Sequence, residues 1–112
     1  MIGHPKPVTY RNAALRTLIN VLGARAEMPC MDCGRADGTV CCAHSNQGKG
    51  MGIKAGDETS AGLCSICHAK LDQPSWRDAR AKDERREYEH EMNLRTLRWL
   101  LTRGHLLVSN HY

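Results

Sequence analysis

Two CxxC pairs are the feature that most constrains how this chain can fold. Cys30 and Cys33 form the first pair, and Cys64 and Cys67 form the second. Each pair can offer two thiolates to one ion, and four thiolates complete the tetrahedral site that Zn²⁺ prefers in proteins. Such a site joins two distant segments and contributes on the order of 10 kcal/mol to the folding of a small domain. We therefore expect a structural zinc site at the centre of the fold.

The composition gives this zinc site an energetic role. The chain of 112 residues has no phenylalanine and only 4% aromatic residues, so hydrophobic burial alone would leave a thin core. Its length suits one domain, residues 1–112. We find no apolar run long enough to span a membrane and no signal peptide at the start, MIGHPKPVTYRN. These features predict a cytoplasmic protein with no membrane partner, in which paired cysteines bind metal more often than they form disulfides.

Charge is distributed unevenly along the chain, whose formal net charge is +4. Residues 1–56 carry seven Lys/Arg against three Asp/Glu, residues 57–75 carry one against three, and residues 76–112 carry eight against six. An acidic centre between basic arms suits a site that cuts a polyanion, with DNA as the expected partner. Ordinary solvated surface charge is an alternative explanation for the C-terminal part.

The spacing of apolar residues predicts two helices outside the cysteine region. Leucines and isoleucine recur with helical period over residues 10–24, and Gly23 should mark the end of that helix. A second, long helix should run over about residues 75–103, with Ser75 as its N-cap and Gly104 as its stop. The apolar arc of this last helix could also form a homodimer.

Between these helices lie a short strand and a short helix that carry histidine. Residues 39–44 should form the strand, and because strand side chains alternate, Cys42 and His44 should share one face. The segment CSICHAKLD begins a helix that places His68 and Asp72, at i and i+4, on one face. A histidine base opposite a histidine–carboxylate pair is what hydrolysis of a phosphodiester needs. The alternative is that His68 supports or replaces a zinc ligand and Asp72 is a helix-end residue.

The segment CSICH also matches the CxxCH signature for attachment of c-type haem. Haem attachment requires export, for which the sequence has no signal. The other CxxC pair, Cys30 and Cys33, points to zinc instead. A thioredoxin-like dithiol is disfavoured too, because no βαβ pattern surrounds either pair.

Three motifs together resemble phage and prophage nucleases of the YbcO type, which belong with the HNH-like, ββα-metal endonucleases. They are AHSN (43–46), GKGMGIKAGD (48–57) and CSICHAKLD (64–72). The resemblance implies that His44 deprotonates the attacking water, that His68 binds a catalytic Mg²⁺ or Mn²⁺, and that the paired cysteines hold structural zinc. It also implies a glycine-rich loop over 48–56 that contacts the DNA backbone, and its candidate contacts are Asn46, Lys49 and Lys54.

Two positions depart from the commonest HNH pattern. Ala43 stands where Asp or His usually binds the metal, and Thr59 stands where Asn is usual. Asp57, Asp72 or Asn46 could supply the missing ligands.

The sequence therefore predicts an α+β fold, in which a zinc-stabilised ββα-metal unit over about residues 30–73 lies between an N-terminal helix and a long C-terminal helix. The predicted function is metal-dependent DNA cleavage, linked to phage recombination or DNA processing in the bacterial cytoplasm. The main alternative is a non-catalytic zinc module that binds nucleic acid or a protein partner.

Overall fold

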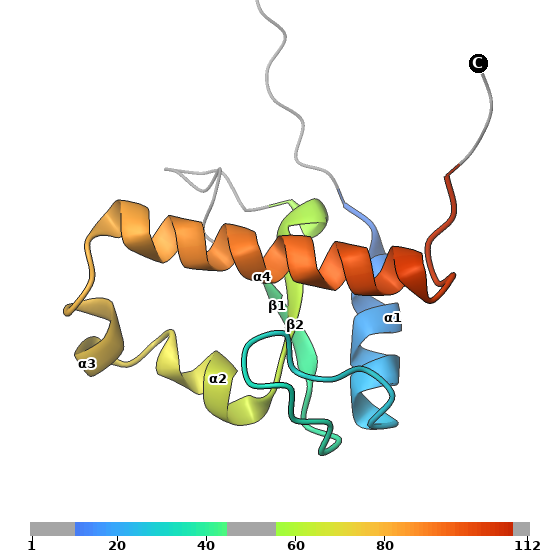
Figure 1. The fold of residues 1–112 in the computed structure, drawn as a ribbon, viewed down its shortest axis with the longest axis horizontal. Helices are drawn as coiled ribbons and strands as arrows, with labels where there is room; N and C mark the ends of the chain where they lie inside the picture. The colour runs from blue at the N-terminus through green and yellow to red at the C-terminus, as the bar shows by residue number, and fades with distance from the viewer. Residues whose placement is uncertain (1–10, 45–55, 109–112) are drawn as a thin grey trace, which may run out of the picture.

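The structure is a computed structural model that describes residues 11–44 and 56–108. Helices and strands mix along the chain, and two strands form one small sheet, as an α+β fold requires (Figure 1). The elements in order are helix α1 (Ala13–Ala24), strand β1 (Cys41–His44), the 3-10 turn η1 (Asp57–Thr59), strand β2 (Ser60–Leu63) and helices α2 (Ser65–Lys70), α3 (Pro74–Arg77) and α4 (Lys82–Thr102). None of the helices in these two ranges has the length and apolar character needed to cross a membrane.

The two strands form an antiparallel hairpin around which the helices pack. Cys41 is opposite Leu63 at one end of the hairpin, and His44 is opposite Ser60 at the other. Helix α1 packs on β1 and helix α4 packs on β2 (Figure 1). All four residues of β2 are buried. The hairpin is therefore the centre of the molecule, and its two ends are the two places where chemistry-bearing side chains gather.

Polar side chains of α4 bind the outer edge of β2. The hydroxyl of Thr96 accepts a hydrogen bond of 3.1 Å from the backbone N–H of Gly62. The side-chain amide of Asn93 donates to the carbonyl of Ser60 at 2.9 Å, and the N–H of Met31 donates to the carbonyl of Gly62 at 3.0 Å. Both α4 side chains are buried. They satisfy strand groups that burial would otherwise leave without partners.

Helix α1 runs past the glycine that we expected to end it. The helix ends at Ala24, and Ala26 takes the left-handed conformation, with φ of 57°, that closes the helix. Gly23 is buried inside the helix, and a Cβ built on it would lie 1.9 Å from the carbonyl oxygen of Val40. The prediction for Gly23 was therefore wrong, because this glycine allows close approach of α1 to the chain before β1.

The predicted helix over residues 75–103 is two helices. Pro74 begins the short α3 with Gln73 as its N-cap, so Ser75 lies inside a helix and caps none. The break before α4 lets Trp76 lie edge-on to Tyr88, with ring centroids 5.3 Å apart. In a continuous helix these residues would be about 18 Å apart along the axis. The predicted stop is confirmed, since α4 ends at Thr102 and Gly104 has φ of +77°.

Candidate functional site

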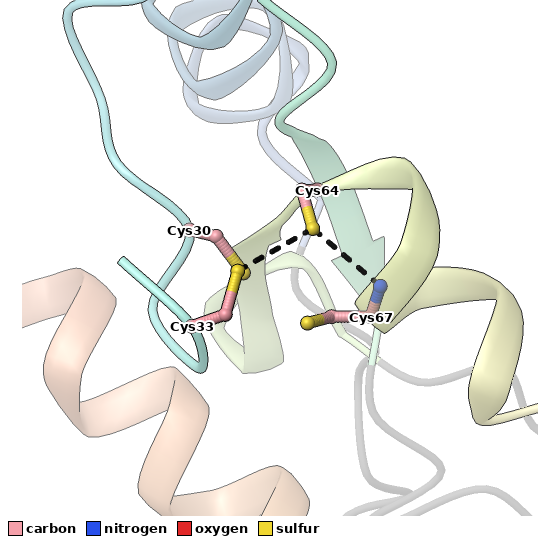
Figure 2. A group of neighbouring side chains, drawn as sticks. All are labelled: Cys30, Cys33, Cys64 and Cys67. Carbon is pink, nitrogen blue, oxygen red and sulfur yellow. Dashed lines mark hydrogen bonds between the residues drawn. The ribbon is translucent and has the colours of Figure 1, made fainter. Parts of the chain in front are cut away.

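The four cysteines of the two CxxC pairs meet at the Cys41–Leu63 end of the hairpin. Their sulfur atoms all lie within 4.8 Å of one another, and Cys33 Sγ is 3.7 Å from Cys64 Sγ (Figure 2). Cys30, Cys64 and Cys67 are buried, whereas Cys33 is exposed. Four converging sulfurs are the donor set of a structural zinc site. These cysteines could therefore hold a metal ion such as zinc, as the sequence predicted.

Local backbone geometry aims the two pairs at each other. In the first pair, the N–H of Gly34 donates to the carbonyl of Cys30 at 2.9 Å, and Gly34 has φ of 78°, which favours glycine. In the second pair, Cys64 is the N-cap of α2, and its sulfur accepts the N–H of Cys67 at 3.5 Å (Figure 2). One pair therefore lies on a tight turn and the other on the first turn of a helix.

The surroundings shift the pKa values of these thiols in opposite directions. Burial raises the pKa of the Cys30 thiol, but backbone N–H groups of Cys64, Cys33 and Asp32 outweigh burial and bring it to about 7. Burial and the neighbouring sulfurs raise the pKa of Cys67 far above its ordinary value. Thiolates bind metal and thiols do not. An ion binding here must therefore displace protons that the cluster otherwise keeps.

A polar clamp that the sequence did not reveal fixes the first cysteine pair to α2 and α4. Asp32 accepts hydrogen bonds of 2.5 Å from Lys70 Nζ and from the hydroxyl of Tyr88. Burial raises the pKa of Asp32, but these two donors outweigh it and hold the pKa below its usual range. Arg95 Nη1 donates to the carbonyl of Met31 at 2.9 Å. The residues that make these contacts lie 38 to 64 positions away along the chain. They hold Cys30 and Cys33 in position.

At the opposite end of the hairpin, His44 pairs with Asp57. His44 Nε2 is 2.7 Å from Asp57 Oδ1. The Asp57 side chain is fully buried, whereas the His44 side chain is 34% exposed. An imidazole with one nitrogen on a buried carboxylate and part of its ring open to solvent has the form of an oriented general base.

Residues at the start of α1 complete the surroundings of Asp57. The backbone N–H of Asn12 donates to Asp57 Oδ2 at 2.5 Å. Arg16 Nε lies 3.2 Å from Oδ2, and Arg11 Nη1 lies 3.6 Å from Oδ1. The Asn12 N–H, followed by His44 and Arg16, holds the pKa of Asp57 below its ordinary value. Both carboxylate oxygens of Asp57 therefore already have protein partners, although the sequence suggested Asp57 as a metal ligand.

His68 and Asp72 do not join His44. His68 Nδ1 lies 3.3 Å from Cys41 Sγ, and side chains at Cys41 and His44 leave β1 on opposite faces. Asp72 is exposed just beyond α2. Within residues 11–44 and 56–108, the four cysteines of the two CxxC pairs are the one group of three or more residues with the geometry to hold a metal. Cys41 and Cys42 lie outside that group.

The predicted DNA contacts of the glycine-rich loop cannot be compared with the structure. Asn46, Lys49 and Lys54 all fall outside the described residues. Their assignment stays a prediction.

No protein-family model, curated protein or solved structure matches this chain.

Proposed function

We propose that this chain is a metal-dependent endonuclease that hydrolyses DNA phosphodiester bonds with His44 as the general base. The observation that supports this most directly is the 2.7 Å contact between His44 Nε2 and the buried carboxylate of Asp57. The motif resemblance independently suggests the same role for His44, in an HNH-like site of a phage-encoded enzyme acting in the bacterial cytoplasm. Zinc on the four cysteines would serve as scaffold and take no part in the reaction.

The His44–Asp57 contact determines which nitrogen of His44 can act. Asp57 has a lowered pKa and is therefore a carboxylate at neutral pH, which can only accept a hydrogen bond. His44 Nε2 must then carry the proton, so the lone pair of the neutral ring is on Nδ1. In the proposed reaction, Nδ1 takes a proton from water as the water oxygen attacks phosphorus. The bond from phosphorus to the 3′ oxygen breaks, and that oxygen takes a proton from solvent. Asp57 stabilises the imidazolium that forms.

The charge around Asp57 also suits an anionic substrate. Two arginines lie against the carboxylate of Asp57, next to His44. The side chains of Arg11 and Arg16 are 45% and 42% exposed, so each can also meet solvent or a phosphate. Arginine binds phosphate oxygens well because its planar group offers several donors. This supports a phosphodiester as the substrate.

The resemblance implies that cleavage requires Mg²⁺ or Mn²⁺. Such an ion would neutralise charge on the scissile phosphate. The described residues do not fit a complete site for it, because His68 faces Cys41 and both oxygens of Asp57 are in use. We therefore assign no step of the reaction to His68 or Asp72.

The same separation of His44 from His68 favours a second candidate function. A zinc module that binds nucleic acid or protein without cutting would need the cysteine cluster and would not need a divalent-ion site. In that case the His44–Asp57 pair only fastens the end of β1 to η1.

Cleavage of supercoiled plasmid by zinc-loaded protein, with and without Mg²⁺ or Mn²⁺, separates the two functions. We expect wild-type protein to nick the plasmid only with the divalent ion, and His44→Ala to lose roughly 10²-fold or more of the rate. His90→Ala is the matched control, because His90 is an exposed histidine of α4. Equal activity of wild type and His44→Ala, or no cleavage by either when both are folded, would overturn the proposed enzyme.

A further inference from the structure

A groove runs between the first cysteine pair and the C-terminal part of α4. Pro29, Cys30 and Met31 line one side of it, and the other side is formed by Arg95, Arg98, Trp99, Thr102 and Arg103. Its volume is about 360 Å³. We call it the knuckle groove. Since it contains Cys30, it lies at the cysteine end of the hairpin and is separate from the residues around His44.

The charge in the knuckle groove has one sign. Three arginines line it, and no carboxylate is among the described residues that do so. Arg95 is held in place by the carbonyl of Met31 at 2.9 Å and by Glu91 at 3.0 Å. Arg98 and Arg103 are exposed at its rim. Glu91 offsets the charge of Arg95, so the two exposed guanidinium groups of Arg98 and Arg103 are the charges that attract a polyanion.

The aromatic residue of the groove is already in contact with its neighbours. The Trp99 ring stacks on His105 with centroids 5.6 Å apart, and the Arg103 guanidinium lies 5.1 Å from the Trp99 ring centre. Trp99 therefore orients Arg103 and is poorly placed to stack on a nucleobase. Contacts from arginine to phosphate position the DNA and carry no information on base sequence.

We propose that the knuckle groove binds the phosphodiester backbone of duplex DNA, as a second contact surface apart from His44. The inference shares a nucleic-acid partner with the proposed function, but it requires neither cleavage nor a divalent ion. The groove would hold and orient DNA on the zinc-bearing face of the protein. Arg98 and Arg103 supply the contacts to phosphate, and Arg95 supports the wall.

An alternative role for these arginines, which does not involve DNA, can be distinguished from DNA binding by experiment. Zinc with four thiolates carries a formal charge of −2, and the nearby arginines could serve only to balance it. That role predicts weaker zinc binding when they are removed and no effect on DNA.

The test is binding of a short fluorescent DNA duplex to zinc-loaded protein without Mg²⁺, measured by anisotropy over a series of salt concentrations. The variant Arg98→Gln/Arg103→Gln removes the two rim charges. Arg77→Gln/Arg80→Gln removes the same charge from the exposed α3 region and is the matched control. Zinc content and thermal melting are measured for both variants to establish that each is folded.

We expect the groove variant to bind DNA about tenfold more weakly or worse, and the slope of log K against log salt to fall by about 2. The control should keep the wild-type slope. The inference is overturned if both variants lose the same affinity, if the groove variant loses zinc but keeps DNA affinity, or if the groove binds single-stranded RNA or an acidic peptide more tightly than duplex DNA. Plasmid nicking is scored separately, so failure of the proposed cleavage and failure of this groove give different results.

Discussion

At the Leu63 end of the hairpin, four cysteines from two short motifs form a cluster, whereas at the His44 end a histidine meets residues from the start of α1 and from η1. The cysteine end consists of side chains whose spacing along the chain already pairs them. The histidine end depends on the tertiary fold, because Asn12 reaches Asp57 across 45 residues. A motif can therefore reveal the first end, and only the packed fold reveals the partners at the second.

The two ends should also differ in what they contribute. Sulfur ligands that close a metal site stabilise the fold. A part-exposed imidazole on a buried carboxylate adds little to a core, and its value would lie in reactivity. Three substitutions test this division.

The largest effect should come from breaking the cysteine end. Cys64→Ser removes a buried thiol of the candidate zinc site, and we expect it to abolish zinc binding and cost on the order of 10 kcal/mol, so that the protein unfolds. Circular dichroism and zinc analysis measure this. Cys42→Ser is the control, since Cys42 lies outside the four-cysteine group, and it should keep both zinc and fold. A folded, zinc-free Cys64→Ser protein would show that the cysteine end is not the scaffold.

Asp57→Asn should lower the free energy of unfolding less than Cys64→Ser does, but it should clearly reduce the cleavage activity. The amide keeps the shape of the carboxylate but no longer forces the proton onto His44 Nε2 or stabilises the imidazolium. We expect the nicking rate to fall by about 10²-fold while zinc content stays at the wild-type level. Asp78→Asn changes an exposed carboxylate, 73% accessible, and should leave the rate unchanged. Loss of zinc in Asp57→Asn would mean that the two ends are not separable.

The smallest effect should come from the clamp that supports the cysteine end. Asp32→Asn should cost about 1–2 kcal/mol by weakening the bonds from Lys70 and Tyr88. Because the pKa of Asp32 is lowered in the folded protein, its contribution is complete at pH 7 and is lost only as the pH falls below about 4. Urea unfolding at pH 7 of Asp32→Asn, Tyr88→Phe and the double variant measures the coupling. If the two substitutions have strictly additive effects on the free energy of unfolding, the contact between Asp32 and Tyr88 does not stabilise the fold.

The elements that could be predicted from the sequence are those governed by local rules. Zinc-ligand spacing brought out Cys30, Cys33, Cys64 and Cys67, and the Gly104 stop followed from helix-capping preferences. Gly23 was misjudged because its role is contact with Val40, which no local pattern encodes. The break between α3 and α4 was missed because it serves the packing of Trp76 on Tyr88.

The same limit explains the candidate site. His44 could be chosen from its place at the end of a strand, but its partner could not. Asp57 is separated from His44 by a glycine-rich segment, and its charge suggested a metal ligand. Burial, hydrogen bonds with Asn12 and His44, and two nearby arginines give it a different role in the structure. Asp32 likewise looked like an ordinary residue between two cysteines.

The hydrogen bonds that Asn93, Thr96 and Met31 make with the outer edge of β2 have a consequence for how copies of this protein meet. A two-stranded sheet normally offers free edges to which a strand from another molecule can be added, and such addition begins aggregation. Here the N–H and carbonyl of Gly62 and the carbonyl of Ser60 are already bonded within the chain. Strand-to-strand association along β2 would first have to pull α4 away, so these two polar helix residues also guard the protein against misassembly.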